Sequence, residues 1–177
     1  ADIIDLGMGN PTDGAPQIVI DKLCEAARDP RNHRYSASRG IKNLRKEIAK
    51  KYQKKWNVDL DWQSEILSCI GSKEGFSHIC LAMLGPGDTA IVPDPAFPIH
   101  NYGVALAGGN VISVRLGNDE AFLNRIADVC EHLFPKPKLL ILNYPHNPTT
   151  MTVEPAFFET IVELAKRFGI TVIHDFA

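Results

Sequence analysis

Short apolar runs alternate with longer amphipathic segments through most of the chain. The runs that fit strands are Ile66–Ile70, Thr89–Val92, Val111–Val114, Leu139–Leu142 and Ile170–His174. The segments between them that fit helices are Lys73–Leu84, Ile99–Ala107, Ala121–Leu133 and Pro155–Phe168. Nearly continuous apolar runs are typical of strands that are buried on both faces of a parallel sheet. The pattern therefore predicts an α/β fold with a mainly parallel sheet covered by helices on both faces.

The first forty residues follow a different pattern. Asp2 to Pro16 is rich in Gly, Pro, Asn and Asp, which predicts an irregular arm. A short helix over Gln17–Arg28 should end at Asp29-Pro30, because the residue before a proline avoids the helical region. A longer helix, Ile41–Trp56, follows Gly40. We expect residues 1–40 to form the arm with its first helix, and residues 41–177 to form the first part of a larger domain.

Composition narrows the possible partners. Hydrophobic residues make up 45%, charged residues 23%, and the formal net charge is -2, as in an ordinary soluble domain. The basic residues between Arg39 and Lys55 alternate with apolar ones and fit the solvated face of a helix, which argues against nucleic acid as a partner. No apolar run reaches the roughly 20 residues of a membrane helix. The four cysteines form no CxxC pair, so we expect a reducing, cytoplasmic location and no metal site.

A candidate anion site follows the first of these runs. Gly71, Ser72 and Lys73 open the next helix, where successive backbone N–H groups and a serine hydroxyl can bind a phosphate. The same residues also fit an ordinary strand-to-helix turn in which Ser72 is the N-cap.

Two proline-containing loops carry further candidates. In the loop from Asp94 to Pro98, two prolines would hold Phe97 as a platform for a flat cofactor, although the ring could equally pack in the core. In the loop from Asn143 to Thr149, two X-Pro bonds, either of which can be cis, would aim the Asn147 amide at a ligand. The alternative is that Asn147 only makes a local turn.

Asp175 ends the last apolar run. A carboxylate at the rim of a buried sheet needs a partner, because desolvating an unpaired charge is costly. It could cap a following helix or belong to a site. Since ligands of open α/β sheets bind beyond the carboxyl ends of the strands, we expect Asp175 and the three loops to meet at one edge.

Six segments in one order give the chain a resemblance to the class I/II aminotransferases of the aspartate-aminotransferase fold. Within that family the chain is similar to the group of bacterial alanine (glutamate–pyruvate) and diaminopimelate aminotransferases. The segments are Leu6-Gly7-Met8-Gly9-Asn10-Pro11, Tyr35-Ser36-Ala37-Ser38-Arg39-Gly40-Ile41, Gly71-Ser72-Lys73-Glu74-Gly75, Val92-Pro93-Asp94-Pro95, Asn147-Pro148-Thr149 and His174-Asp175.

The resemblance implies a role for each candidate in binding pyridoxal 5'-phosphate. Ser72 and Lys73 would hold the phosphate, largely through backbone N–H groups. Phe97 would stack on the pyridine ring. Asn147 would hydrogen-bond the 3-oxygen of the ring, and Asp175 would pair with the pyridinium nitrogen as the catalytic carboxylate.

The resemblance also implies a homodimer. Tyr35 would reach the cofactor phosphate in the site of the neighbouring subunit. Gly9 would lie beside the carboxylate of the substrate. The full-length enzyme would transfer an amino group between an amino acid, alanine or glutamate by preference, and a 2-oxo acid.

The chain departs from the family pattern in two respects. Thr150 stands where the family often has glycine after Asn-Pro-Thr, so the loop backbone is expected to differ slightly. The Schiff-base lysine, the tyrosine after the aspartate and two arginines of the family would lie beyond Ala177, and Lys73 is a poor substitute for that lysine. We therefore expect the chain as given to be inactive alone. Since Ala1 is not an initiator, we also expect preceding sequence to have been removed.

Two alternatives stay open. One is a pyridoxal-phosphate-dependent C–S β-lyase on the same fold. The other is a non-catalytic phosphate- or nucleotide-binding α/β module, prompted by Gly7-Met8-Gly9, which lacks the strand and helix that a dinucleotide fingerprint needs.

Overall fold

The computed structural model describes residues 3–4, 7, 9 and 11–176. Leu6, Met8 and Asn10 of the first family segment lie outside the described residues, as does Ala177. The chain divides into two compact units, residues 1–68 and 69–177. The boundary at residue 40 that we expected stays a prediction.

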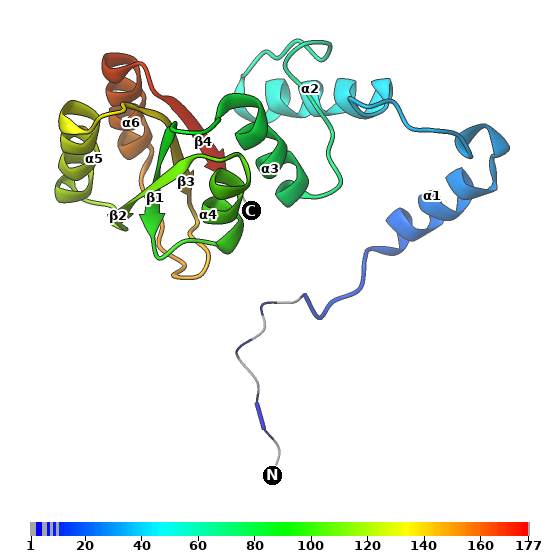
Figure 1. Cartoon of the computed structure of the whole chain (residues 1–177). Helices are drawn as coiled ribbons and strands as arrows, with labels where there is room; N and C mark the ends of the chain where they lie inside the picture. Colours follow the sequence, from blue (N-terminus) through cyan, green and yellow to red (C-terminus); the bar gives the residue numbers. More distant parts are fainter. Residues whose placement is uncertain (1–2, 5–6, 8, 10, 177) are drawn as a thin grey trace. The chain divides into compact units, whose positions relative to one another are not determined.

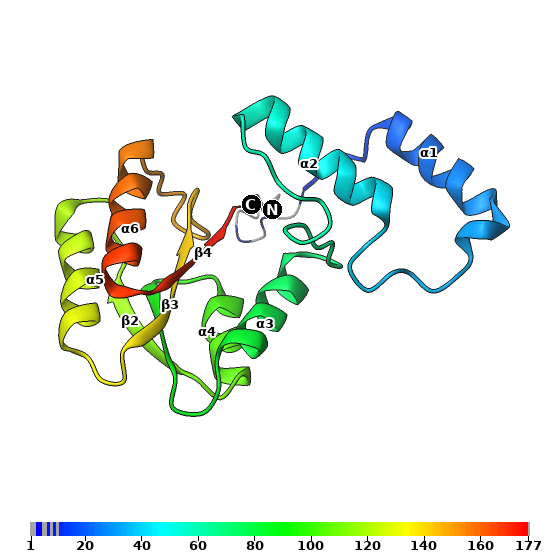
Figure 2. The same ribbon diagram turned by 90° about the horizontal axis from the view of Figure 1, so that it is seen from above.

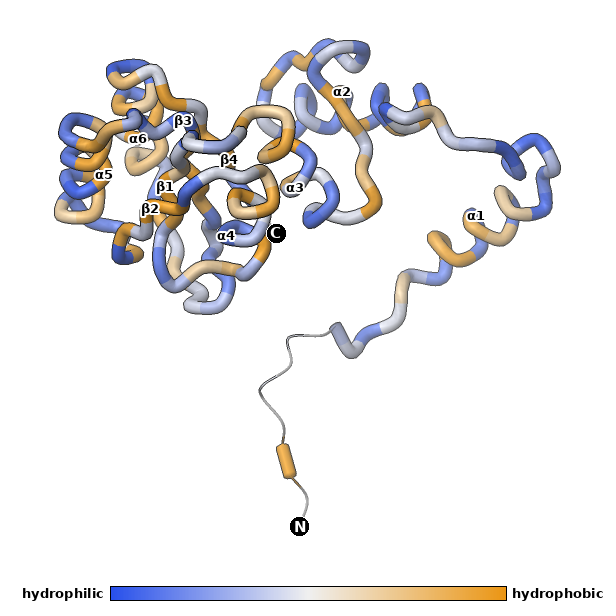
Figure 3. The backbone as a smooth tube through the Cα atoms, viewed as in Figure 1, coloured by the Kyte–Doolittle hydropathy of each residue, from blue (hydrophilic) through white to orange (hydrophobic). Residues whose placement is uncertain are grey.

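The described residues of the first unit form two α-helices and a 3-10 turn. These are α1 (Gln17–Arg28), η1 (Pro30–Asn32) and α2 (Lys42–Trp56), which agree with the two helices predicted for this region. Helix α1 ends at Asp29, whose backbone is extended before Pro30 and whose carboxylate accepts a hydrogen bond from the Arg31 amide at 3.0 Å. Ile18 and Leu23 are exposed on α1, where Figure 3 shows hydrophobic segments along the tube.

The second unit is built on a sheet of four parallel strands in the order β2-β1-β3-β4. The strands are β1 (Thr89–Asp94), β2 (Asn110–Arg115), β3 (Pro137–Asn143) and β4 (Thr171–Asp175), drawn as arrows in Figure 1. The predicted parallel α/β sheet is confirmed, and each strand overlaps the run that predicted it.

Helices cover both faces of this sheet (Figure 2). Helices α3 (Ser72–Met83) and α4 (Pro98–Leu106) lie on one face, and α5 (Glu120–His132) and α6 (Pro155–Phe168) lie on the other. Alternate residues of β3 pack on opposite sides: Leu139 and Ile141 join the α3/α4 core, while Leu140 and Leu142 join the α5/α6 core. Burial on both faces explains why the run Leu139–Leu142 within β3 is apolar throughout.

The predicted strand over Ile66–Ile70 is wrong. This segment is irregular, and the Ser68 amide donates to the Arg39 carbonyl at 3.1 Å instead of joining a ladder. Ile66 is buried, but Leu67 and Ile70 are exposed. A short apolar run predicts a buried strand only when both of its faces are covered, and here a single apolar side chain is buried.

None of the helices in the described part of the chain is long and apolar enough to cross a membrane.

Candidate functional site

The carboxyl ends of β1, β3 and β4 lie at the same edge of the sheet because the strands are parallel. Asn143 at the end of β3 is in register with Asp175 at the end of β4. Strand β1 ends at Asp94 and leads into the loop that carries Phe97. The two loops that carry Phe97 and Asn147 therefore start from neighbouring strand ends, whereas the loop at Gly71 follows an irregular segment.

Asp175 has a partner on helix α4. The Nε2 atom of His100 lies 3.0 Å from Oδ2 of Asp175, and the His100 side chain is 2% exposed. Because an ionised carboxylate can only accept, a hydrogen bond to it requires the proton of His100 to be on Nε2. The ring centroids of Phe76 and Phe97 lie 5.0 and 5.9 Å from the His100 ring. The expectation that Asp175 needs a partner is confirmed, but the sequence did not single out His100.

A second residue that the sequence did not single out joins Asp175 to the Asn147 loop. Asn143 is 4% exposed, and its Nδ2 atom donates to the backbone oxygen of Asp175 at 2.7 Å. Its Oδ1 atom accepts from the backbone N–H of Asn147 at 2.8 Å. The sequence did contain a signal for Asn143. This polar residue directly follows the apolar run Leu139–Leu142 at the end of its strand, and Asp175 likewise ends its strand.

The loop after β3 is anchored by a buried histidine. Both of its X-Pro bonds, Tyr144-Pro145 and Asn147-Pro148, are cis. His146 is buried, and its Nδ1 atom lies 2.9 Å from the Thr149 hydroxyl. Burial lowers the pKa of His146. This buried ring anchors the Asn147 loop from within, while Asn147 itself is exposed.

Phe97 is half-buried and belongs to neither hydrophobic core cluster. The alternative that it packs in the core is therefore wrong. The Lys73 Nζ atom lies 5.3 Å from the centroid of the Phe97 ring, and the edge of the ring meets His100. Lys73 and Phe97 thus lie side by side. A residue that binds the phosphate of a ligand and a residue that stacks on the ring of the same ligand would need this proximity.

Helix α3 begins at Ser72, and Gly71 holds the N-cap position with φ 82°. The alternative that Ser72 is the N-cap is wrong, because Ser72 is already the first helical residue and Gly71 precedes it as the N-cap. Within the part of the chain that the structure describes, no side chain caps α3, and the Glu74 carboxylate accepts from the amide of Ile70. The N–H groups of the first turn, including those of Ser72 and Lys73, suit an anion.

These contacts form one continuous path across the carboxyl edge of the sheet. Its members in order are Lys73, Phe97, His100, Asp175, Asn143 and Asn147. A cation and a helix N-terminus lie at one end, an aromatic ring follows, and a carboxylate and an amide lie at the other end. This donor set fits a flat, negatively charged heteroaromatic ligand.

The remaining predicted residues belong to the first unit. Tyr35 is fully exposed, and Gly9 is exposed with open space where a Cβ atom would lie. Their roles toward a neighbouring subunit and a substrate stay predictions.

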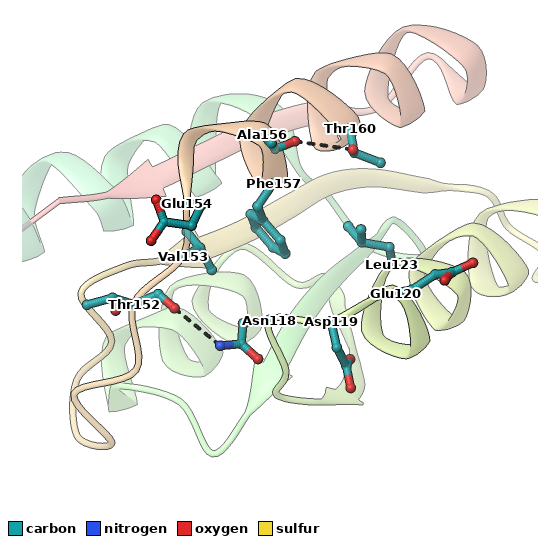
Figure 4. Close-up of a pocket in the computed structure, with 10 residues that line it drawn as sticks. All are labelled: Asn118, Asp119, Glu120, Leu123, Thr152, Val153, Glu154, Ala156, Phe157 and Thr160. Carbon is teal, nitrogen blue, oxygen red and sulfur yellow. Dashed lines mark hydrogen bonds between the residues drawn. The ribbon is translucent and has the colours of Figure 1, made fainter.

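A separate pocket of about 470 Å³ lies between the β2–α5 loop and the start of α6 (Figure 4). None of its lining residues is among the predicted site residues. Asp119 accepts from the Phe122 amide at 2.9 Å as the N-cap of α5, and the Asn118 amide donates to the Thr152 carbonyl at 3.4 Å. These bonds anchor the two loops that form the rim of the pocket.

The fold and these contacts together define an α/β protein with a candidate ligand site at the carboxyl edge of a parallel sheet. The sequence profile of aminotransferase class I and II matches residues 1–177, and the chain belongs to this family.

Similarity to individual aminotransferases supports this family membership. The chain is 47% identical to glutamate-pyruvate aminotransferase AlaC of Escherichia coli, over 99% of this chain and 43% of the relative. It is 42% identical to an LL-diaminopimelate aminotransferase of Moorella thermoacetica, over 99% of this chain and 45% of the relative. A solved structure, a probable N-succinyldiaminopimelate aminotransferase from Thermus thermophilus, superposes with a TM-score of 0.88 at 31% identity, over 98% of this chain and 47% of that one. The chain thus spans less than half the length of these relatives.

Proposed function

We propose that this chain is the N-terminal, cofactor-holding part of a pyridoxal-5'-phosphate-dependent aminotransferase. The enzyme exchanges an amino group between an amino acid, alanine or glutamate by preference, and a 2-oxo acid. The carrying observation is the hydrogen-bonded connection from His100 through Asp175 and Asn143 to Asn147 in a chain of this family. The glutamate–pyruvate specificity in the name of the relative AlaC supports the substrate pair.

The residues present fit the cofactor. The first turn of α3 and Lys73 would hold the phosphate, Phe97 would lie against the pyridine ring, and Asn147 would hydrogen-bond the 3-oxygen. Asp175 would face the ring nitrogen. When bound, pyridoxal phosphate supplies an electron sink for the electrons that remain when the α-proton of a substrate departs.

Asp175 tunes that electron sink. A carboxylate beside the ring nitrogen favours the protonated, positively charged ring, because an opposite charge stabilises the charged form. His100 donates to Oδ2 and so fixes the orientation of the carboxylate. Oδ2 is the carboxylate oxygen that makes this hydrogen bond in the described part of the chain, so Oδ1 is the oxygen that we assign to the ring nitrogen.

The first unit and the rest of the protein complete the site in this proposal. Tyr35 reaches the phosphate in the site of a neighbouring subunit, so the working enzyme is a homodimer, and Gly9 lies beside the substrate carboxylate. The lysine that binds the cofactor covalently belongs to the segment that the relatives have beyond the matched region. We place the enzyme in the cytoplasm.

The test uses the full-length protein. Titration with pyridoxal phosphate should give an absorbance band near the visible edge that borohydride fixes as a lysine adduct, and alanine with 2-oxoglutarate should give pyruvate and glutamate. Asp175→Ala should reduce turnover far more than cofactor binding. Unchanged turnover in Asp175→Ala would contradict the assignment. Release of pyruvate and ammonia from a cysteine conjugate, without amino transfer, would point to a C–S β-lyase instead.

A further inference from the structure

A buried amide lies where β3 ends and the Asn147 loop begins. Asn143 is 4% exposed, although it ends a strand at the carboxyl edge of the sheet. Burying an amide side chain is costly unless its polar atoms are paired. Both polar atoms of Asn143 have partners, and those partners belong to the two residues that face the cofactor ring in the proposed function.

The bonds of Asn143 go to backbone atoms. Nδ2 donates to the Asp175 carbonyl at 2.7 Å and, more weakly, to the Pro145 carbonyl at 3.4 Å. Oδ1 accepts from the Asn147 amide at 2.8 Å. A side chain that bonds the backbone of another residue sets the position from which that residue extends. Among the side-chain hydrogen bonds of the described residues, those of Asn143 are the ones that reach both Asp175 and Asn147.

The ligand explains why such a connection is useful. The ring nitrogen and the 3-oxygen of pyridoxal phosphate belong to one rigid aromatic ring, so the distance between them cannot adapt to the protein. The two protein groups must therefore be held at a matching separation, within about 0.5 Å of the productive geometry. Asn147 is exposed on a loop, where its position would otherwise vary.

We propose that Asn143 is a positioning residue that holds Asp175 and Asn147 at the separation that the cofactor ring requires. This inference rests on the proposed function. It adds a residue that does not touch the cofactor but acts through the backbone of two residues that do.

The competing explanation is that Asn143 only stabilises the fold, and a matched control separates the two. Thr89 is 3% exposed, and its hydroxyl donates to the Pro135 carbonyl at 3.2 Å. It lies at the start of β1, the end of the sheet opposite to the site. Thr89→Val removes a buried side-chain bond to a backbone carbonyl, as Asn143→Ala does, without altering the site.

The experiment compares Asn143→Ala, Asn143→Asp and Thr89→Val in the full-length protein. Three quantities are measured: the Kd for pyridoxal phosphate, the pH dependence of the bound cofactor's absorbance, and hydrogen exchange of residues 143–150 without cofactor. For Asn143→Ala we expect a Kd raised about tenfold or more, the factor that one well-placed buried hydrogen bond supports. We also expect a shifted pH dependence of absorbance and faster exchange at Asn147. Thr89→Val should leave all three at the wild-type values.

Asn143→Asp separates the two connections. Its carboxylate can still accept from the Asn147 amide, so exchange there should stay slow. It cannot donate to the Asp175 carbonyl, so the pH dependence of the absorbance should still shift.

The outcomes that overturn the inference are distinct. If Asn143→Ala speeds loop exchange but binds cofactor with the wild-type Kd and spectrum, Asn143 does not position the site. If Asn143→Ala and Thr89→Val weaken cofactor binding equally, the effect is one of general stability. In both cases the proposed function stands. If the wild-type protein binds no pyridoxal phosphate, the proposed function fails, and the inference fails with it.

Discussion

The Nε2 atom of His100 lies 3.0 Å from Oδ2 of Asp175, across 75 positions of sequence. One residue stands in the first turn of α4 and the other at the end of β4. The bond therefore fixes the carboxylate relative to the loop that carries Phe97, whose ring meets His100 at its edge. The ring platform and the carboxylate are coupled through a single buried imidazole.

Removing that imidazole should impair the site. His100→Ala leaves the partly buried Asp175 without its donor, which costs about 1.5–3 kcal/mol for a hydrogen bond to a charged group, or roughly 10- to 100-fold in turnover of the full-length enzyme. His100→Gln, whose amide can still donate, should recover part of the loss. Steady-state kinetics with alanine and 2-oxoglutarate provide the measurement.

An exposed pair of a histidine and an aspartate provides the control for that prediction. The Nδ1 atom of His132 lies 3.1 Å from Asp128, and both side chains are exposed. Because exposed pairs contribute little, His132→Ala should leave turnover unchanged. Equal effects of the two alanine variants would show that the bond between His100 and Asp175 has no special role.

Packing behind His100 gives a second prediction. A Cβ atom on Gly103 would lie 2.8 Å from Cε1 of Phe76, and Phe76 packs against the His100 ring with centroids 5.0 Å apart. Gly103→Ala should therefore cost about 1–3 kcal/mol of unfolding free energy through overpacking, and it should weaken cofactor binding by displacing His100.

Chemical denaturation and cofactor titration measure the two effects of Gly103→Ala. Gly85→Ala is the control, because its Cβ atom would meet nothing nearer than an Asp88 oxygen at 3.9 Å. Wild-type stability in Gly103→Ala would mean that Phe76 can move without disturbing the core.

The sequence predicted the elements of the second unit well because their apolar runs report burial on both faces. It also placed Asp175 and Asn147 at one edge, since parallel strands share their carboxyl ends. It could not predict the bond between Asp175 and His100, because that contact depends on strand order and on which helix covers which face. His100 comes shortly after Phe97 and Pro98 in a largely apolar segment. There the sequence does not distinguish a histidine that pairs with a carboxylate from one that is merely buried.

The Ile66–Ile70 segment shows how the apolar pattern can also predict a strand that does not form. Its composition matches that of a true strand such as β1, yet it has no strand partner in the structure. Local pattern reports that a segment is apolar, while strand formation also requires a neighbouring strand that supplies the other half of each hydrogen bond.

Acid should loosen the loop that His146 anchors. Burial lowers the pKa of His146 below its ordinary value of 6.5. The folded state therefore favours the neutral ring, and the stabilisation is complete above pH 6.5 and is lost as the pH falls toward the lower, folded-state pKa. Protonation would also remove the acceptor that Nδ1 offers to Thr149, and nearby His100 lowers the pKa of His146 further.

We expect the unfolding free energy of the full-length protein to fall between pH 7 and pH 5, and His146→Gln to flatten part of that fall. Denaturant titrations at several pH values measure it. The exposed residue His132 again serves as the control, since its substitution should leave the slope unchanged. A slope that His146→Gln does not alter would place the acid sensitivity elsewhere.

Thr150 is strained, and relieving the strain should stabilise the loop. Its φ is 61°, and its amide donates to the His146 carbonyl at 2.7 Å. A left-handed conformation costs a residue with a Cβ atom about 1–2 kcal/mol, more than the roughly 0.5–1 kcal/mol that glycine loses in backbone entropy. Thr150→Gly should therefore raise the unfolding free energy by about 0.5–1 kcal/mol. Thr152→Gly, at an exposed position without positive φ, should lower it instead. If both glycine variants are destabilised alike in denaturant titrations, the left-handed conformation of Thr150 carries no net strain, and the prediction is wrong.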